Sequence, residues 1–327
     1  MRVLVTGGAG FIGSAYVRNL LGGRLPGPLP ASVTVLDTFT YAGNEANLAP
    51  VAADPRLRVV RGDIADPDAV AAVLAGVDLV VHFAAESHVD RSIAGSAEFV
   101  RTNVLGTHCL LEAARTAGVR RFVHVSTDEV YGSIDVGSWP ETHPLAPNSP
   151  YAASKAASDL LCRSFFVTHR LPVLVTRCSN NYGPYQHPEK FVPRAISTLL
   201  DGGTVPLYGD GHHVREWLHV DDHCRAIQLV VARGVPGEIY HVGGGTQLTN
   251  RELLARLLRA TGRDWTSVEP VADRAAHDRR YALDGRKLAR LGFRPRVDID
   301  SGLAATVAWY ADHRSWWQPL RPAVLPG

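Results

Sequence analysis

The chain opens with Arg2-Val3-Leu4-Val5-Thr6-Gly7-Gly8-Ala9-Gly10-Phe11-Ile12-Gly13, and this stretch decides its fold. An apolar, strand-like run leads directly into glycines at positions 7, 10 and 13, and a helical pattern follows. Small residues at such a turn let the backbone approach a phosphate, and a helix N-terminus adds free N–H groups and partial positive charge. The stretch therefore predicts a dinucleotide-binding strand-helix unit, with a tight turn that binds no ligand as the alternative.

Short runs rich in Val, Leu and Phe recur along the first half of the chain, separated by segments of helical periodicity. After the first strand they lie at 33–36, 57–60, 79–83, 122–126 and 173–176. This alternation predicts an α/β protein with a parallel sheet covered on both faces. Long helices are expected within 99–114 and from 151 to 165, and the Gly- and Pro-rich segment 22–30 is expected to be a surface loop.

The regular alternation fades after Arg177, where turn signals alternate with short apolar pieces. We expect a dinucleotide-binding domain over 1–177 and a smaller C-terminal α/β lobe over 178–327, with some chain crossing back to the sheet. Helical patterns return in this lobe at 251–261 and 303–313.

Composition excludes several classes of protein. The 327 residues are 46% hydrophobic and carry a net charge of +2, from 34 basic and 32 acidic residues without a long run of one sign. Neither a nucleic-acid nor a membrane partner is predicted, and because the apolar runs are short we expect a cytoplasmic protein. The cysteines, Cys109, Cys162, Cys178 and Cys224, lack C-x-x-C spacing, which predicts buried free thiols.

Acidic residues follow the second and third predicted strands. Asp37 ends the second strand, where a carboxylate binds the ribose hydroxyls of NAD. No arginine occurs in 38–41 to neutralise a 2′-phosphate, so NAD is favoured over NADP. Asp63 has two equal interpretations, an acceptor for the adenine amino group or a helix cap.

Two further segments carry groups for acid-base chemistry. Tyr151 and Lys155 are one helical turn apart, so the ammonium favours the phenolate and suits oxidation of an alcohol. Asp128 and Glu129 end the fifth strand and add a second acid-base pair, provided that the strand has ended there, since neighbours on a strand face opposite ways. A solvated strand end is the alternative for that pair.

Seven segments together resemble the dTDP-glucose 4,6-dehydratases, members of the extended short-chain dehydrogenase/reductase superfamily. They are GGAGFIG (7–13), HFAAESHVDRSI (82–93), STDEVYG (126–132), YAASK (151–155), RCSNNYGPYQHPEKF (177–191), PLYGDG (206–211) and VREWLHVDDH (214–223). The resemblance extends to about Tyr310. It implies a Rossmann-type doubly wound sheet, NAD as cofactor, a nucleotide-sugar substrate, and a homodimer in which helices around 99–117 and 151–169 of each subunit form a four-helix bundle.

The resemblance also implies a reaction, the dehydration of dTDP-glucose to a 4-keto-6-deoxy sugar nucleotide. Tyr151 would take the O4 proton as NAD takes the C4 hydride, with Lys155 stabilising the phenolate and binding the nicotinamide ribose. The resulting ketone makes C5–H acidic, so Glu129 would remove that proton while Asp128 protonates the departing C6 hydroxyl, and the hydride then returns to C6. Thr127 would hydrogen-bond the C4 oxygen.

Further residues are assigned to ligands by position in the resemblance. The cofactor-binding set is Gly7, Gly10, Phe11, Ile12, Gly13, Asp37, Thr38, Thr40, Asp63, Ile64, Ala84, Ala85, Thr102, Tyr151, Lys155 and Asn181. The substrate-binding set is Ser87, Thr127, Asn180, Lys190, Pro206, Tyr208, Arg215, Asn250, His277 and Tyr281. Arg215 would clamp the diphosphate, with a surface ion pair as its alternative, and the two asparagines could instead form a turn.

Other readings of the whole chain remain open. A sugar-nucleotide 4-epimerase or decarboxylase shares the glycines and the Tyr-Lys pair, and the Asp128-Glu129 pair argues against it. A non-catalytic NAD-binding sensor is opposed by the presence of Tyr151 and Lys155. No metal is expected at His82, His88 or His124, because no Cys or carboxylate stands at ligand spacing and the mechanism needs none. Thymidine versus uridine preference and the pathway served are left open.

Overall fold

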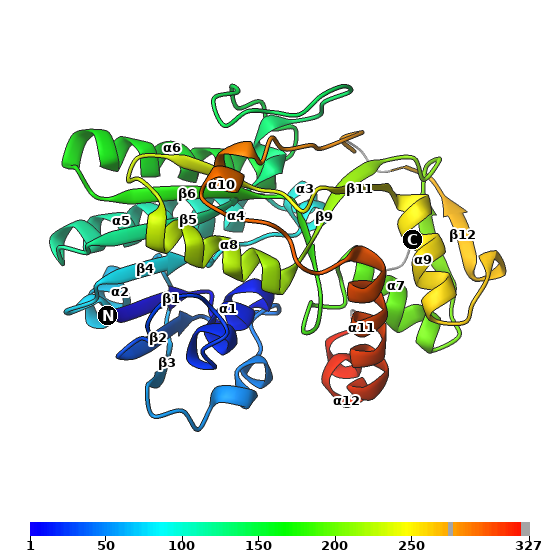
Figure 1. Cartoon of the computed structure of the whole chain (residues 1–327), viewed down its shortest axis with the longest axis horizontal. Helices are drawn as coiled ribbons and strands as arrows, with labels where there is room; N and C mark the ends of the chain where they lie inside the picture. The colour runs from blue at the N-terminus through cyan, green and yellow to red at the C-terminus, as the bar shows by residue number, and fades with distance from the viewer. Residues whose placement is uncertain (274–276, 322–327) are drawn as a thin grey trace.

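The computed structural model describes residues 1–273 and 277–321 (Figure 1). Its larger part is a parallel sheet of seven strands in the order β10-β6-β5-β4-β1-β2-β3. The strands are β1 (Arg2–Thr6), β2 (Ser32–Asp37), β3 (Leu57–Arg61), β4 (Leu79–His82), β5 (Arg121–Thr127), β6 (Val173–Cys178) and β10 (Ile239–Val242). Every pairing in this sheet is parallel, which confirms the predicted α/β class of Rossmann type.

Helices cover both faces of this sheet. One face carries α1 (Phe11–Leu21) and α8 (Val220–Arg233), and the other carries α2 (Pro67–Leu74), α5 (Thr107–Thr116) and α6 (Pro150–His169). Val3 and Val5 pack toward the first pair of helices, whereas Leu4 packs toward the other three. Because successive residues of a strand face opposite ways, a sheet buried on both faces needs such uninterrupted apolar strands.

The helix expected within 99–114 has an irregular middle. It comprises α4 (Ala97–Phe99), a stretch of π-helix η3 (Val100–Gly106), and α5. On η3, the Asn103 side chain exchanges hydrogen bonds of 2.9 Å with the backbone N–H and C=O of Glu86, and donates to Ser154 Oγ at 2.8 Å. The widened turn thus ties this helix to α6 and to the loop that follows β4.

The smaller lobe has two short sheets, one of order β11-β9-β7 and one pairing β12 with β8. Its apolar core lies between these sheets and helices α7, α9 and α11. The strands are β7 (Asn180–Tyr182), β8 (Val205–Tyr208), β9 (Val214–His219), β11 (Thr246–Thr249) and β12 (Val268–Val271), and the helices are α7 (Phe191–Leu200), α9 (Asn250–Ala260), α11 (Ile299–Asp312) and α12 (Arg314–Trp317). The remaining elements of the described chain are α3 (Val89–Ala94), α10 (Arg286–Arg290), η1 (Glu45–Asn47), η2 (Ala49–Val51), η4 (Asp128–Tyr131), η5 (Trp265–Ser267) and η6 (Gln318–Leu320).

The helices and strands predicted from the sequence agree closely with those of the structure. The six predicted strands are present with ends displaced by at most two residues, the segment 22–30 is a loop, and α9 and α11 overlap the helices predicted in the second half in all but the last residue of each. β10 was not predicted individually, nor was the pairing of β8 with β12. Since β10 returns to the large sheet from the second half of the chain, the domain boundary at 177 stays a prediction.

Three of the four cysteines are buried free thiols, as predicted, and Cys109 is half-buried. Within the described ranges, the helices are too short or too polar to cross a membrane.

Candidate active site

The glycine loop after β1 is packed so tightly that side chains do not fit. Gly7 has φ +67°, and a Cβ there would lie 2.5 Å from the backbone nitrogen of Ala84. A Cβ on Gly13 would lie 2.2 Å from the carbonyl oxygen of Gly7. The loop therefore packs its backbone against the start of α1 and the end of β4, and leaves a cavity of about 360 Å³ above the carboxyl ends of the strands.

All residues predicted to bind the cofactor line this cavity, as do Ser87, Thr127, Asn180 and Lys190 of the predicted substrate set. The sequence did not single out several other lining residues. They are polar groups at or just after strand ends (Glu86, Ser126 and Ser179), on η3 (Arg101), and on the loop after β7 (Gln186, His187 and Glu189). Their place at or just after the end of a predicted strand was a usable signal for Glu86, Ser126 and Ser179, because ligands bind at that edge of an open sheet.

Asp37 is buried and held by the backbone. Its Oδ2 accepts from the N–H of Ala9 in the glycine loop, and its Oδ1 accepts from the N–H of Phe39, both at 2.9 Å. Burial raises the pKa of Asp37, and these two donors oppose the rise. Since each carboxyl oxygen has a second lone pair, Asp37 can still accept from the hydroxyls of a ribose.

Asp63 is not the cap of the following helix. The N-cap of α2 is Asp66, whose side chain accepts from Asp68 N and Ala69 N. Asp63 instead pairs with Arg101 at 2.7 Å and faces the cavity. Of its two interpretations, the helix cap is wrong, and the contact to adenine stays a prediction.

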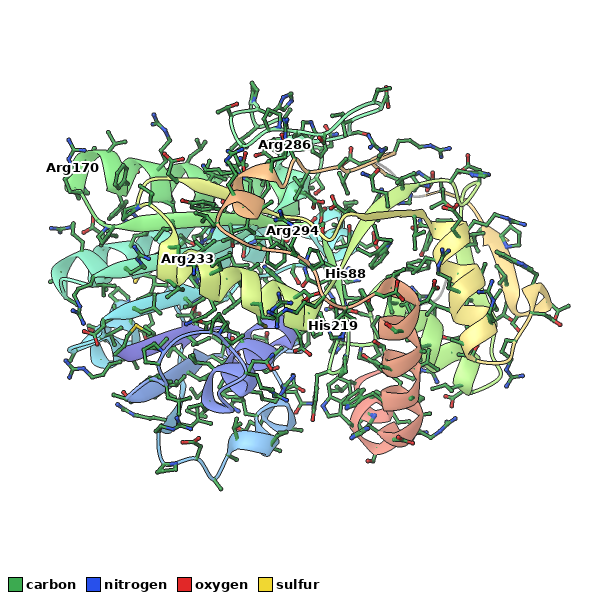
Figure 2. The ribbon with its side chains drawn as sticks, in the orientation of Figure 1. His88, Arg170, His219, Arg233, Arg286 and Arg294 are labelled. Atoms are coloured by element: carbon green, nitrogen blue, oxygen red, sulfur yellow. The ribbon has the colours of Figure 1, made fainter. Side chains whose placement is uncertain are left out.

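A second cavity of about 200 Å³ lies between the large sheet and the smaller lobe. It shares Ser87, Glu129, Asn180, Glu189 and Lys190 with the first cavity, so the two adjoin. The remaining substrate-set residues line it: Pro206, Tyr208, Arg215, Asn250, His277 and Tyr281. His88, which Figure 2 labels between the two parts of the molecule, also lines it, and burial lowers the pKa of that histidine to about 4.

The Asp-Glu pair lies just past the end of β5, which confirms that the strand has ended there. Thr127 caps a single 3-10 turn, η4, by accepting from the N–H of Glu129 at 3.3 Å. Gly132, with φ +81°, ends the turn. Because a 3-10 turn does not alternate faces as a strand does, Asp128 and Glu129 both line the first cavity.

Asp128 is a buried carboxyl group with one unsatisfied oxygen. Its exposed fraction is 2%, and its Oδ2 has no hydrogen-bond partner among the described residues. Burial raises the pKa of Asp128 well above its usual value, and the nearby carboxylates of Glu129 and Glu216 raise it further, while Arg215 opposes them. The protonated form is therefore favoured, and Asp128 can donate a proton.

Tyr151 is the second residue of α6, whose start is fixed by Ser149 and Pro150. The Ser149 hydroxyl accepts from Ala152 N at 3.1 Å, and proline suits the first helical position. Burial raises the pKa of Tyr151 well above its usual value and the charge of Glu129 adds to this, while a hydrogen bond with Thr127 lowers it.

Lys155 is buried beside the first cavity. Its Nζ donates to the carbonyl of Val125 on β5 at 2.8 Å and lies 3.5 Å from His124 Nε2. The ammonium thus faces β5, and burial rather than Lys155 dominates the pKa of Tyr151 in the protein alone. The Lys155 ammonium therefore lowers the pKa of Tyr151 less than the Tyr-Lys spacing in the sequence suggests.

Arg215 is buried in the second cavity, with 6% of its surface exposed, so its alternative as a surface ion pair is wrong. Its guanidinium donates to the carbonyls of Val214 and Asp278 at 2.8 and 2.9 Å and lies 4.4 Å from the ring centroid of Tyr281. Held in this way by backbone oxygens and an aromatic face, it presents positive charge to an anionic ligand.

The two asparagines after β6 differ in their bonding. Asn181 donates to the carbonyl of Ser179 at 2.9 Å, and its Oδ1 lies 2.9 Å from His223 Nδ1, so its amide is bonded to the protein itself. Asn180 lines both cavities, and its Oδ1 has no partner among the residues described. Asn180 is therefore the better placed of the two for a ligand.

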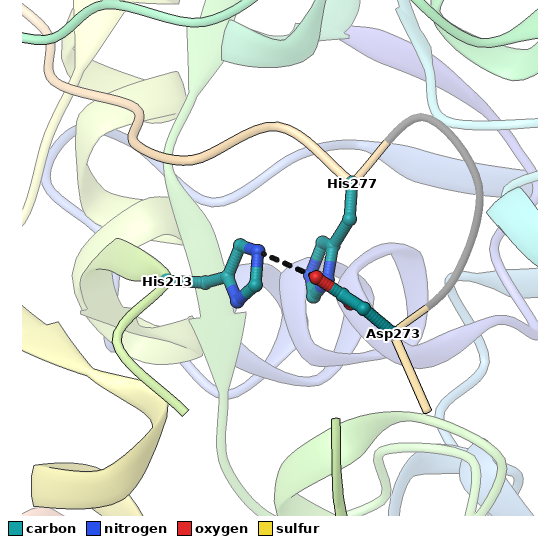
Figure 3. Close-up of side chains that lie close together, drawn as sticks. All are labelled: His213, Asp273 and His277. Carbon is teal, nitrogen blue, oxygen red and sulfur yellow. Dashed lines mark hydrogen bonds and ion pairs between the residues drawn. The ribbon is translucent and has the colours of Figure 1, made fainter. Parts of the chain in front are cut away.

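A cluster that the sequence did not reveal lies at the edge of the second cavity (Figure 3). Asp273 places one oxygen 2.6 Å from His277 Nδ1 and the other 3.3 Å from His213 Nε2. These are metal-ligating residue types with ligand atoms within 4.8 Å of one another. However, the two imidazoles are stacked, with centroids 3.6 Å apart and planes at 14°, so their in-plane lone pairs run side by side instead of converging. The carboxylate bridges them as a hydrogen-bonded clamp on His277.

Comparison with known proteins agrees with this geometry. A family model described as GDP-mannose 4,6 dehydratase matches residues 4–306. The chain is 62% identical to a dTDP-glucose 4,6-dehydratase of Streptomyces antibioticus and 59% identical to one of Streptomyces niveus; the matches cover 99% and 98% of this chain, and 97% and 96% of those proteins.

The crystal structure of DesIV, a dTDP-glucose 4,6-dehydratase from Streptomyces venezuelae with NAD bound, superposes with a TM-score of 0.97 at 65% identity. That match covers 98% of this chain and 100% of DesIV. Because these likenesses run through the sheet, the Asp-Glu turn and the smaller lobe alike, the chain belongs to the dTDP-glucose 4,6-dehydratase family.

Proposed function

We propose that this protein dehydrates dTDP-glucose to dTDP-4-keto-6-deoxyglucose, with NAD as a cofactor that is regenerated in each cycle. The observation that carries the proposal is the position of the Asp128-Glu129 turn. It lies where a cavity suited to a dinucleotide meets a cavity lined by Arg215, with Tyr151 lining the same region. The full-length relatives named above as dTDP-glucose 4,6-dehydratases support the substrate.

The first cavity fits NAD. The glycine loop offers an approach for a pyrophosphate, and Asp37 can accept from ribose hydroxyls. Ser126 Oγ, Ser179 Oγ and Asn180 Oδ1 line this cavity, are buried, and have no hydrogen-bond partner within the described part of the chain. A polar ligand would satisfy them, since buried polar groups are normally hydrogen-bonded. DesIV, which was crystallised with NAD, agrees with the NAD prediction.

The first chemical role belongs to Tyr151. When bound, NAD supplies a hydride acceptor at C4 and later a hydride donor at C6. Lys155 stabilises the phenolate form of Tyr151, and this phenolate accepts the proton from O4 and becomes a neutral phenol. Thr127, which hydrogen-bonds Tyr151, holds the C4 oxygen against it.

The second step eliminates water across C5 and C6. A ketone at C4 makes the C5 proton acidic, and Glu129 removes it as the general base. Asp128 donates its proton to the C6 hydroxyl, which leaves as water. The raised pKa of Asp128 keeps the proton on this residue until it is needed, so the same burial that isolates the carboxyl group prepares it for its role.

The second cavity binds the nucleotide. Arg215 holds the diphosphate, and Lys190, whose Nζ donates to the carbonyl of Ser87 at 2.7 Å, adds a second cation at the junction of the cavities. The other residues of the predicted substrate set contact the sugar and the base.

A homodimer is part of the proposal. The helical segment 97–116 and α6 lie side by side (Figure 1), and each carries exposed apolar side chains. Val100, Leu105, Leu160 and Val167 are 54%, 54%, 58% and 47% exposed, which is typical of an association surface. Two such surfaces would form the four-helix bundle that the family resemblance implies.

Sedimentation should therefore give twice the chain mass of 35.4 kDa. Leu160→Glu should yield monomers, while Leu29→Glu, at an equally exposed leucine on the loop before β2, should not. A monomeric wild type would refute the dimer. The cytoplasmic location stays a prediction that fractionation of cells would test.

The decisive experiment incubates the purified protein with dTDP-glucose, without and with added NAD, and follows the base-induced absorbance of a 4-keto-6-deoxy sugar. Formation of that product supports the proposal, and formation without added NAD shows that the cofactor is tightly held. If product is absent under both conditions, the dTDP-glucose assignment is wrong, and a panel of other sugar nucleotides then separates another substrate from an epimerase or a sensor.

A further inference from the structure

A buried ionic network lies beneath Tyr151, where α6 packs against β5 and β6. Its members are Lys155 and Asp159 on α6, His124 on β5, and Arg177 on β6. All four side chains are buried. Ions are costly to bury unless they are paired, so the arrangement of these charges needs a reason.

Asp159 is the only carboxylate among these four residues; it pairs directly with Arg177 and is connected to Lys155 through His124. Its Oδ2 accepts from Arg177 Nε at 2.8 Å, and its Oδ1 lies 3.3 Å from His124 Nε2. His124 Nε2 is in turn 3.5 Å from Lys155 Nζ. Lys155 and Asp159 are also four residues apart on one helix, which places them on the same face.

The hydrogen bonds favour one tautomer of His124. Its Nδ1 has no partner among the described residues, so a proton there would leave a buried donor unpaired, whereas a proton on Nε2 has Ser158 Oγ as an acceptor. With the proton on Nε2, the ring donates to Ser158 Oγ, 3.2 Å away, while Asp159 Oδ1 lies 3.3 Å from the same nitrogen without a hydrogen bond among the described residues. Burial lowers the pKa of His124 to about 4, so the ring is neutral near pH 7. The net charge of the network therefore depends only on Lys155, Asp159 and Arg177.

We propose that Asp159 is a positioning residue that keeps Lys155 charged and oriented beside Tyr151, with Arg177 anchoring the carboxylate. This inference rests on the proposed function of Lys155, to stabilise the phenolate. Two buried cations and one carboxylate leave the network one negative charge short, and a phenolate at Tyr151 supplies that charge.

Electrostatics agree with this role. Burial lowers the pKa of Lys155, and the charge of Asp159 is the largest effect that opposes it. Arg177, in turn, is the largest effect that opposes the desolvation of Asp159 and holds the pKa of that carboxyl group at about 2. Asp159 is therefore ionised near pH 7.

The other titratable groups around Lys155 do not replace Asp159. Burial raises the pKa of the thiols Cys162 on α6 and Cys178 on β6, so both are neutral near pH 7. His82 on β4 lies beside His124, with ring centroids 5.2 Å apart and planes tilted by 41°, and is likewise neutral, because burial lowers its pKa well below the usual value. Beyond the tyrosine, Asp128 is kept protonated by its own burial.

On its far side, Arg177 is bonded to the surrounding fold. It donates to the hydroxyl of Tyr131, which lies 2.6 Å from His241 Nε2 on β10. This chain of contacts fixes the guanidinium independently of Asp159. It also gives β10, which returns to the sheet from the second half of the chain, a direct connection to the site.

Lysine NMR tests the proposal directly, because Lys155, Lys190 and Lys287 are the chain's lysines. Lysine labelled with ¹³C at Cε gives one signal for each, and Lys287→Arg and Lys190→Arg assign them. In Asp159→Asn, the pKa of Lys155 should fall by about one unit or more, as expected on loss of a nearby opposite charge. The titrations of Lys190 and Lys287 should not move.

Two further variants distinguish a specific effect on Lys155 from a general loss of structure. Asp159→Asn leaves Arg177 without its carboxylate, so Asp159→Asn/Arg177→Gln removes both charges and should still show a downward shift of Lys155, smaller because a like charge is lost as well. Asp222→Asn removes a carboxylate that is also buried and paired with an arginine, Arg225, but on α8 across the sheet. It should destabilise the fold and leave Lys155 unchanged.

Asp159→Glu, which retains the charge, should restore most of the Lys155 pKa. An unchanged Lys155 titration in folded Asp159→Asn or in the double variant would overturn the proposal, as would an equal shift in Asp222→Asn. These outcomes do not depend on the substrate, so failure of the dTDP-glucose assay and failure of this inference are distinguishable.

With the proposed activity in hand, the alkaline limit of the pH–rate profile should move to lower pH in Asp159→Asn and return in Asp159→Glu. A uniform loss of rate at every pH would instead assign Asp159 a merely structural role.

Discussion

The two cavities of this protein are built in different ways. The cofactor cavity is closed by backbone, since at Gly7 and Gly13 a single added carbon would collide with main-chain atoms. The substrate cavity is closed by side chains that come from β8, β9, α9 and the segment after β12. A backbone-built wall tolerates almost no substitution but is specified by a few consecutive residues, whereas a side-chain-built wall tolerates more and is specified by residues far apart.

We expect the greatest losses of activity from substitutions at the junction of the two cavities. Glu129→Gln and Asp128→Asn should each reduce dehydration by about 10²- to 10⁴-fold, the range for loss of a general acid or base. Product formation from dTDP-glucose measures this. Asp135→Asn, at an exposed carboxylate soon after the same turn, serves as the control and should retain activity.

The two halves of the reaction can be separated at this junction. Glu129→Gln should still oxidise C4, seen as absorbance of reduced nicotinamide during a single turnover, because Tyr151 remains. Tyr151→Phe should not. If Glu129→Gln dehydrated normally, the assignment of the general base would be wrong.

The backbone wall can be tested with Gly13→Ala. Its Cβ would lie 2.2 Å from the Gly7 carbonyl oxygen, so the loop must open and NAD affinity should fall by about 10- to 100-fold, at about 1.4 kcal/mol per tenfold. Titration of the apoprotein with NAD measures this. Gly285→Ala is the matched control, because a Cβ there meets nothing within 4 Å. Normal affinity in Gly13→Ala would contradict the backbone-built wall.

Substitutions in the side-chain-built wall of the substrate cavity should have smaller effects. Arg215→Lys keeps the charge but loses the planar fork, so KM for the nucleotide sugar should rise about tenfold with a smaller change in kcat. Steady-state kinetics separate the two constants. Arg256→Lys, in an ion pair with Asp300 on the outer surface, should change neither. A selective fall in kcat would instead place Arg215 at the reacting centre.

The smallest effect concerns stability at a contact between the two parts. His223 on α8 contacts Asn181 on β7, and burial lowers its pKa to about 3. Its folded pKa lies below the unfolded value of about 6.5, so the unfolded chain binds the extra proton in this window. The stability that neutral His223 provides is complete above about pH 6.5 and is lost as pH falls toward 3.

His223→Gln should therefore reduce the fall in unfolding free energy below pH 6.5 by at most about 1.4 kcal/mol per pH unit. Urea denaturation at several pH values measures the slope, and His212→Gln, a histidine on an exposed turn, is the control. Identical slopes in His223→Gln and the wild type would show that His223 is not a buried neutral group.

Sequence reasoning located the backbone-built region well, because local patterns specify it. Strand ends, the glycine loop and the acid at the end of β2 are set by neighbours within a few residues. The Asp-Glu turn was also located, since the end of β5 is a local event, although the capping by Thr127 that shapes it was not anticipated.

Long-range arrangements were not accessible in that way. The clamp of His213 and Asp273 on His277 joins residues some sixty positions apart, and the network around Asp159 joins three elements. Nothing in the local pattern distinguishes Asp159 from an ordinary helical carboxylate. Likewise, Asp63 and Asp66 both suit a helix cap in sequence, and only the structure shows which one the helix uses.

The late return of β10 has a consequence for how the chain folds during synthesis. This strand pairs with β6 at the edge of the large sheet, yet it follows the smaller lobe's strands β7, β8 and β9 in the chain. A ribosome must therefore complete most of the polypeptide before the large sheet has its last strand. Contacts between residues distant in sequence slow folding. We therefore expect the large sheet of the nascent chain to lack its edge strand, and to need protection from aggregation, until β10 emerges from the ribosome.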